Sequence, residues 1–280
     1  MLSMAKGFDS KINRLQHELP EGLLVDAAWM EAHGYSSSLR SQYVKAGWLD
    51  QPARRVYRRN RQPLIWQQVV MSLQVVLDYP LIVGGRTGLE LQGYAHYLSH
   101  EVKEVHLYGP VRPPTWVGDL PLDTKFHWHN SQRLFPNDPV PERDVHRLVP
   151  GLTASSLPAS HVVSPNQFTS LPLSASTKER AILEMLDELP DRESFHQVDA
   201  LMEGLSDLSP RRLQTLLENC ASVKVKRLFL FFAERHHHAW FAKLDTTRVD
   251  IGAGKRVLAR GGKLDPLYLI TVPVDLHGLA

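Results

Sequence analysis

Cysteine, long apolar runs and net charge are all scarce in this sequence, and each scarcity excludes a class of protein. The chain has a single cysteine, Cys220, which excludes an intrachain disulfide and a cysteine-rich zinc site. Its longest apolar run, LFLFFA at 228–233, is far shorter than the ~20 residues that a helix needs to cross a bilayer. The opening MLSMAKGFDSKINRL has no continuous apolar core, unlike a secretory signal. We therefore expect a cytoplasmic protein without a membrane partner.

The overall composition is that of a globular protein, and positive charge is concentrated in one segment. The 280 residues, of which 43% are hydrophobic and 22% charged, suit two or three compact units. The whole chain carries a formal net charge of only +2, yet seven basic residues and one acid lie between Arg40 and Arg61. A basic stretch of this kind is typical of a nucleic-acid-binding module.

The residues around this basic stretch predict three helices followed by a hairpin. Helical spacing of apolar residues, with proline or glycine at the ends, places the helices at 9–19, 23–33 and 37–46. Two extended pieces, at 48–49 and 55–59, then flank a Gln-Pro turn. This is the order of a winged helix-turn-helix, and we expect that domain at residues 1–61.

The third helix and the hairpin carry the side chains that we predict to bind double-stranded DNA. If Leu39 is at the centre of the buried face, a step of about 100° per residue places hydroxyls and two cations opposite it. Hydroxyls can contact base edges or phosphates, an arginine can chelate guanine, and hairpin arginines can meet flanking phosphates. A basic face docked on an acidic partner is the alternative. The predicted DNA-binding residues are Ser36, Ser37, Ser38, Arg40, Ser41, Lys45, Arg54, Arg55, Arg58 and Arg59.

The rest of the chain predicts an α+β fold with two further units. Residues 62–175 alternate helical segments and short strands, and end in a Ser-, Pro- and Thr-rich stretch. That composition suits a linker, although HVV and QFTSL within it could be edge strands. Residues 176–280 start with the capping-box pattern of STKERAILEMLDEL. A second helix is expected at 209–220, a strand running into a helix or turn at VKRLFLFFAE, and extended pieces in the tail. We expect a winged helix-turn-helix, a mixed α/β region and a C-terminal helical/β module.

The chain contains the segments KAGWL…VYRR, LIVGGRTGLELQGYAHYL and PPTW, and a tail that includes GGKLDPLYLITVP. Together these segments resemble the AbiEi antitoxin family of bacterial type IV toxin–antitoxin systems. The resemblance implies an N-terminal winged helix that represses the operon's own promoter and a C-terminal antitoxin region. It also implies a nucleotidyltransferase-like toxin as the functional partner, without a stable complex. Because one small domain reads a short site, we expect inverted or repeated operators.

A second basic segment, rich in glycine, lies in the implied antitoxin region. It could contact nucleic acid or an acidic partner, although an exposed sheet edge protected by charge has the same composition. Its basic residues are Lys255, Arg256, Arg260 and Lys263.

Two groups of histidines and a glycine pair are candidates for metal or anion binding, but their spacing does not predict an active site. Consecutive side chains diverge, so His236-His237-His238 is a poor chelate, and no carboxylate accompanies His127 and His129 at a ligand spacing. Gly84-Gly85-Arg86-Thr87 could hold an anion, but it lacks the lysine of a P-loop. The chain has no Gly-Ser dipeptide, so it does not look like the toxin. We expect no metal, no cofactor and no enzymatic activity.

Two other functions stay open. One is a ligand-responsive winged-helix transcription regulator without antitoxin activity, whose sensor would lie around Gly84–Leu98. The other is an enzyme acting on nucleic acid, with histidines as ligands or bases.

Overall fold

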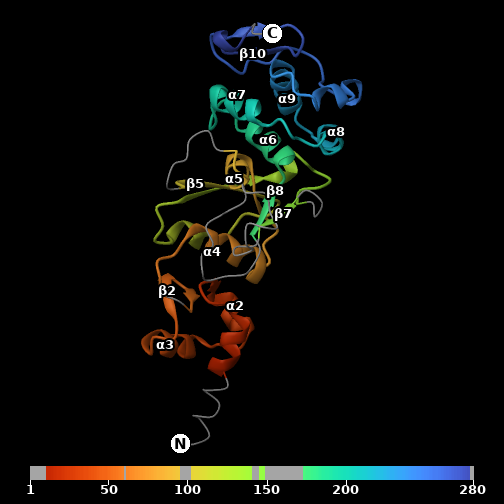
Figure 1. The fold of residues 1–280 in the computed structure, drawn as a ribbon. Helices are drawn as coiled ribbons and strands as arrows, with labels where there is room; N and C mark the ends of the chain where they lie inside the picture. Colours follow the sequence, from red (N-terminus) through yellow and green to blue (C-terminus); the bar gives the residue numbers. More distant parts are fainter. Residues whose placement is uncertain (1–10, 60, 95–101, 141–144, 149–172, 278–280) are drawn as a thin grey trace, which may run out of the picture.

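The computed structural model describes residues 11–59, 61–94, 102–140, 145–148 and 173–277. Figure 1 shows an elongated molecule in which the N-terminal module, a mixed sheet and a helical module follow one another along the long axis. The described residues combine helices with three separate sheets, as the predicted α+β class requires. In the described part of the chain, no helix is long and apolar enough to span a membrane.

The N-terminal module has the element order typical of a winged helix-turn-helix. Residues 11–18 are helical, and an antiparallel sheet of order β1-β3-β2 closes the module. The elements that follow the first helix are β1 (Leu24–Asp26), α2 (Ala27–Ala32), α3 (Ser37–Lys45), β2 (Asp50–Ala53) and β3 (Val56–Arg58).

Two predicted boundaries in this module were wrong. The helix expected from residue 23 begins only at Ala27, because β1 pairs with β3 and Asp26 caps the helix by accepting from the Trp29 N–H at 2.8 Å. The hairpin turn falls at Arg54 and Arg55 and not at the Gln-Pro pair, which lies in β2. Arg55 has a φ of 65°, so the tight turn holds it in the left-handed region.

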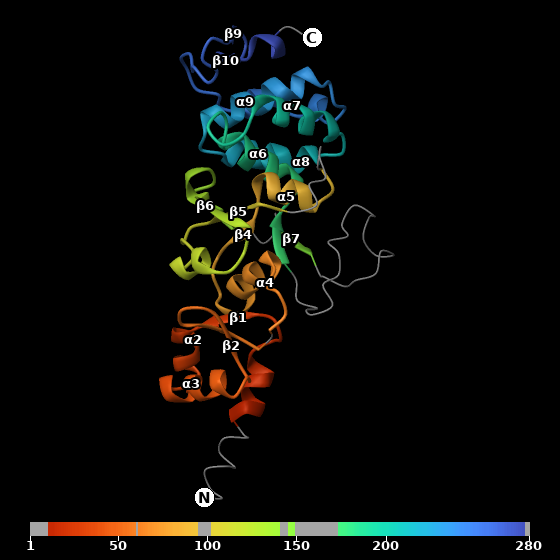
Figure 2. The ribbon, with the colours of Figure 1, turned by 90° about the vertical axis from the view of Figure 1, so that its left-hand side faces the viewer.

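The middle of the chain forms a five-stranded mixed sheet of order β6-β5-β4-β8-β7. Figure 2 shows α4 on one side of this sheet and α5 on the other. The sheet places β8, part of the stretch predicted as a linker, beside β4. The elements are α4 (Trp66–Met71), its π-helical continuation η1 (Ser72–Val76), β4 (Ile82–Val83), α5 (Gly85–Leu91), β5 (Glu104–Gly109), η2 (Thr115–Asp119), β6 (Lys125–Asn130), η3 (Ser131–Arg133), β7 (Val145–Leu148) and β8 (Leu173–Ser176).

The C-terminal part is a helical module followed by a two-stranded hairpin. The segment VKRLFLFFAE, predicted to start as a strand, is helical throughout and belongs to α9. Its residues 228–233 are a continuous apolar run, and such a run does not distinguish a strand from a buried helix by its period. The elements are α6 (Lys178–Asp187), α7 (Phe195–Gly204), α8 (Pro210–Asn219), α9 (Val223–Arg235), η6 (Phe241–Lys243), η7 (Thr246–Arg248), β9 (Lys263–Asp265), β10 (Ile270–Val272) and η8 (Val274–Leu276).

One apolar core runs without interruption from the N-terminal module into the middle sheet. It includes Ile12 near the start of the chain and Ala175 in β8. The N–H of Leu24 donates to the Ser72 hydroxyl at 2.7 Å across the junction. A second core unites α5 with the C-terminal helices. Deleting the N-terminal module would therefore expose part of the core beneath it.

Candidate nucleic-acid interface and polar clusters

The exposed face of α3 is polar and contains a single cation. Ser36 caps the helix by accepting from the Leu39 N–H at 3.4 Å. Figure 1 shows α3 at the outer end of the N-terminal module, away from the middle sheet. The exposed residues of this face are Ser37, Ser38, Ser41, Gln42 and Lys45.

Arg40 is not on this face, which corrects the sequence-based placement. Its side chain is buried, with 5% of the residue exposed. Its Nη1 donates to the carbonyl oxygens of Ala27, at 3.2 Å, and Tyr35, at 2.9 Å. A guanidinium held there connects α2 to α3 and cannot reach a base edge. Loss of DNA binding in Arg40→Ala would therefore report a damaged fold.

Two hairpin arginines also make their contacts within the N-terminal module. Arg58 is 5% exposed and its Nε forms an ion pair with Asp50 at 2.8 Å. Arg59 donates to the carbonyl oxygens of Gln16 and Leu19, both at 2.8 Å. These contacts attach β3 to β2 and to the first helix, which corrects the prediction that both arginines face phosphates.

The remaining candidates form what we call the α3–wing surface. Gln42, which the sequence analysis missed, is on the exposed face of α3. Its position four residues after Ser38 could have revealed it, and a glutamine amide can bind adenine through two hydrogen bonds. Arg54 and Arg55 are exposed at the tip of the hairpin. The surface consists of Ser36, Ser37, Ser38, Ser41, Gln42, Lys45, Arg54 and Arg55.

The second basic segment lies at the opposite end of the molecule, next to β9 and β10 (Figure 2). The buried guanidinium of Arg227 holds the loop before it by donating to the carbonyl oxygens of Ile251 and Gly254, at 2.7 and 2.6 Å. Val257 and Leu267 are 75% and 59% exposed here. We call the exposed cations Lys255, Arg256, Arg260 and Lys263, with these two apolar residues, the distal patch.

The parallel pairing of β5 with β6 gathers histidines that are far apart in the sequence. The register puts His106 opposite His127 and Tyr108 opposite His129. His106 Nδ1 is 3.0 Å from His129 Nε2, and His129 Nδ1 is 2.9 Å from Glu188 Oε1. The sequence analysis missed His106 because only strand pairing brings it to the other two.

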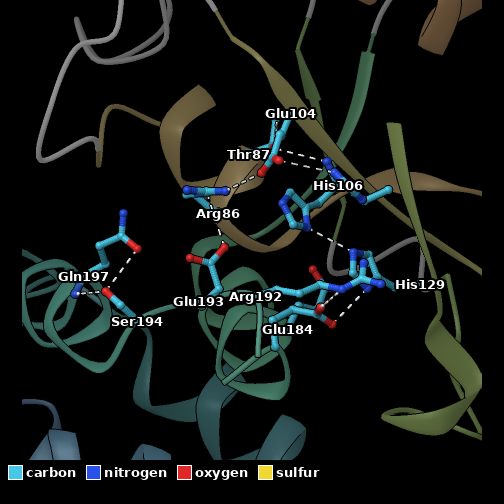
Figure 3. Close-up of polar contacts among 12 residues, drawn as sticks. Arg86, Thr87, Glu104, His106, His129, Glu184, Arg192, Glu193, Ser194 and Gln197 are labelled. Carbon is cyan, nitrogen blue, oxygen red and sulfur yellow. Dashed lines mark hydrogen bonds and ion pairs between the residues drawn. The ribbon is translucent and has the colours of Figure 1, made fainter. Parts of the chain in front are cut away.

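Beside these histidines lies a buried carboxyl group (Figure 3). Arg86 is between Glu104, at 3.0 Å, and Glu193, at 3.3 Å. Burial raises the pKa of Glu193 to about 7, against the opposing effect of Arg86. Burial, reinforced by His129, lowers the pKa of His106 to about 3. His106 is therefore neutral near pH 7, while Glu193 is poised between its two forms.

The glycine pair predicted as a possible anion site has a packing role. The N–H of Gly85 donates to Glu184 Oε2 at 3.0 Å, so a carboxylate of the protein already occupies that amide. A Cβ added at Gly84 would lie 2.1 Å from Glu184 Oε2 and 2.6 Å from a ring carbon of Tyr108. The absence of a side chain permits this close approach.

The remaining candidate reactive groups have structural partners. His236 Nε2 is 2.8 Å from Asp199 and His238 Nε2 is 2.7 Å from the Met202 carbonyl oxygen. Cys220 is buried, which raises its pKa to about 11, so its thiol is not activated. Among the residues that the structure describes, no group of three or more metal-ligating side chains has the arrangement to hold a metal ion.

Comparison with known proteins decides the family. Residues 8–100 match a model described as "Transcriptional regulator, AbiEi antitoxin N-terminal domain". Residues 102–273 match "Transcriptional regulator, AbiEi antitoxin, Type IV TA system". The chain belongs to the AbiEi antitoxin family. This confirms the resemblance seen in the motifs, and it makes the protein a type IV antitoxin and transcriptional regulator by family.

A solved structure shares the fold of this AbiEi-family chain. The crystal structure of RV2827C protein from Mycobacterium tuberculosis aligns with a TM-score of 0.51 at 15% identity, covering 94% of this chain and 90% of that one. A search of curated proteins found no match.

Proposed function

We propose that this AbiEi-family protein represses transcription of its own operon through the α3–wing surface and acts as an antitoxin through its C-terminal part. The toxin would be a nucleotidyltransferase-like protein that the antitoxin counters in the bacterial cytoplasm without forming a stable complex. The observation that carries the regulatory half is the polar exposed face of α3, followed by two exposed arginines at a hairpin tip.

The side chains of the α3–wing surface suit two kinds of contact with DNA, to base edges and to phosphates. Gln42 and the serines have the donors and acceptors that read base edges in the major groove. Lys45, Arg54 and Arg55 have charges for phosphates, which give affinity without sequence preference and make binding depend on salt. A single α3 spans few base pairs, so we propose that two protomers occupy inverted or repeated operator sites.

We expect Gln42→Ala to weaken operator binding by about tenfold to a hundredfold and to relax sequence preference, because a bidentate base contact is lost. Arg54→Ala with Arg55→Ala should instead weaken all duplexes alike and reduce the salt slope by about two. Fluorescence anisotropy over a salt series, with operator and scrambled duplexes, distinguishes these effects. Lys243→Ala, an exposed lysine outside the α3–wing surface, is the control. An equal loss on both duplexes for Gln42→Ala would contradict sequence reading by α3.

The antitoxin role is tested in the full-length chain, because the N-terminal module shares its core with the middle sheet. We expect the combined variant Gln42→Ala, Arg54→Ala, Arg55→Ala to lose repression and still rescue cells that express the toxin. Changing the four cations of the distal patch to glutamate should abolish rescue and leave repression intact. A reporter assay measures repression, and colony counts under toxin induction measure rescue. Failure of the unaltered protein to rescue would leave a regulator without antitoxin activity.

A further inference from the structure

A cavity of about 960 Å³ lies beside β6, outside the surfaces already described. Its wall is formed by the loop between β5 and β6, the first four residues of β6, and Arg192 from the segment after α6. Strand β6 is at one end of the described sheet order, and Figure 2 shows it on the flank of the molecule. The volume is at the upper end of the range in which proteins bind small ligands.

Positive charge converges on this cavity from three separate segments. Arg112 follows β5, Lys125 begins β6, and Arg192 comes from the helical module. Among the described residues of the wall, Asp123 is the only carboxylate. In the described ranges, Arg112 and Lys125 form no ion pair, and Arg192 has one, 3.7 Å from Glu188. Three cations against one carboxylate give the described wall a positive charge, which favours an anionic ligand.

The same wall offers aromatic surface. Phe126 and Trp128 both line the cavity. They are two residues apart on β6, which puts them on one face of the strand.

We propose that this cavity binds a nucleotide. Arg112, Lys125 and Arg192 contact its phosphates, and Phe126 and Trp128 contact its base. Planar bases stack on aromatic side chains irrespective of their identity, and guanidinium groups match phosphate oxygens through paired hydrogen bonds. Nucleotide binding here would be a further activity beside operator binding and rescue. The site is also separate from the glycine pair at Gly84, where the Gly85 N–H already donates to Glu184.

Two sources of the ligand share this chemistry: a free nucleotide and the phosphorylated end of a single-stranded RNA. Isothermal titration of the full-length protein with ATP, GTP, CTP, UTP, a 5′-phosphorylated RNA pentamer and inorganic tripolyphosphate separates them. We expect a free nucleotide or the pentamer to bind more tightly than tripolyphosphate, which lacks a base. Tripolyphosphate binding as tightly as the best nucleotide would overturn the proposal, as would no binding by any nucleotide or by the pentamer.

Variants locate the binding at the cavity. Arg112→Ala and Lys125→Ala should each weaken binding about tenfold or more, because each removes a charge-assisted contact. Trp128→Phe should weaken binding several-fold, because the smaller ring offers less surface on which the base can stack. Lys103→Ala removes an exposed cation just before β5 that does not line the cavity, and should leave the affinity unchanged. Unchanged affinity in Arg112→Ala, Lys125→Ala and Trp128→Phe, with unfolding temperatures preserved, would place the ligand elsewhere.

Discussion

Arg180→Met is expected to lower the free energy of unfolding by about 3–5 kcal/mol, because it leaves a buried carboxylate without its cation. The side chains of Arg180 and Glu184 are 0% and 1% exposed and their charged atoms are 2.8 Å apart. Glu184 also accepts from the Gly85 N–H and from the Ser176 hydroxyl. The pair therefore holds α6 against the middle sheet, and the loss of stability should affect the contact between α6 and that sheet.

The chain contains a matched control for this prediction. Arg14 and Glu18 have the same spacing on a helix, at 2.6 Å, but their side chains are 58% and 25% exposed. Arg14→Met should cause no measurable change, because an exposed pair is solvated and screened. Urea denaturation of both variants compares the two pairs directly. Adding Glu184→Gln to Arg180→Met should recover part of the loss; no recovery would mean that packing of the arginine, and not charge pairing, is responsible.

Glu193→Gln is expected to stabilise the protein at alkaline pH and to have little benefit in acid. The pKa of Glu193 is raised to about 7 in the folded protein from the ordinary 4.5, so the folded state binds the proton more tightly than the unfolded state. The stability from this group is fully present below about pH 4.5 and is lost as pH rises through about 7. A glutamine does not titrate, so the variant escapes that loss.

The expected size of the change in unfolding free energy follows from the shift in the pKa of Glu193. The difference in unfolding free energy between variant and unaltered protein should grow by up to about 3 kcal/mol between about pH 4.5 and about pH 8.5. Denaturant titrations at several pH values measure it, and the lowered pKa of His106 cancels because both proteins share it. Glu104→Gln, at the more exposed partner of Arg86, should show no such growth. A difference that is constant with pH would mean that Glu193 does not titrate in this range.

Local sequence patterns predicted the elements whose ends and faces are determined locally. Helix α8 begins where expected, because Ser209 accepts from the Arg212 N–H and Pro210 occupies the first turn. The order of helices before the hairpin was likewise readable from proline, glycine and serine positions. Strand β1 was missed because its three residues are extended only through pairing with β3. The start of helix α9 was mistaken for a strand because its continuous apolar run, residues 228–233, does not by itself distinguish a strand from a buried helix.

By itself, the sequence determined the family, the α+β class and the presence of a basic N-terminal module with a capped third helix. Only the tertiary structure decided which of the basic side chains in this module stay exposed. Arg40, Arg58 and Arg59 have the same chemistry as Arg54 and Arg55, yet carbonyl oxygens or Asp50 on neighbouring elements engage the first three. The pairing of β5 with β6 similarly decided that His106 joins His129. The partners in these contacts come from separate segments, so spacing along the chain does not reveal them.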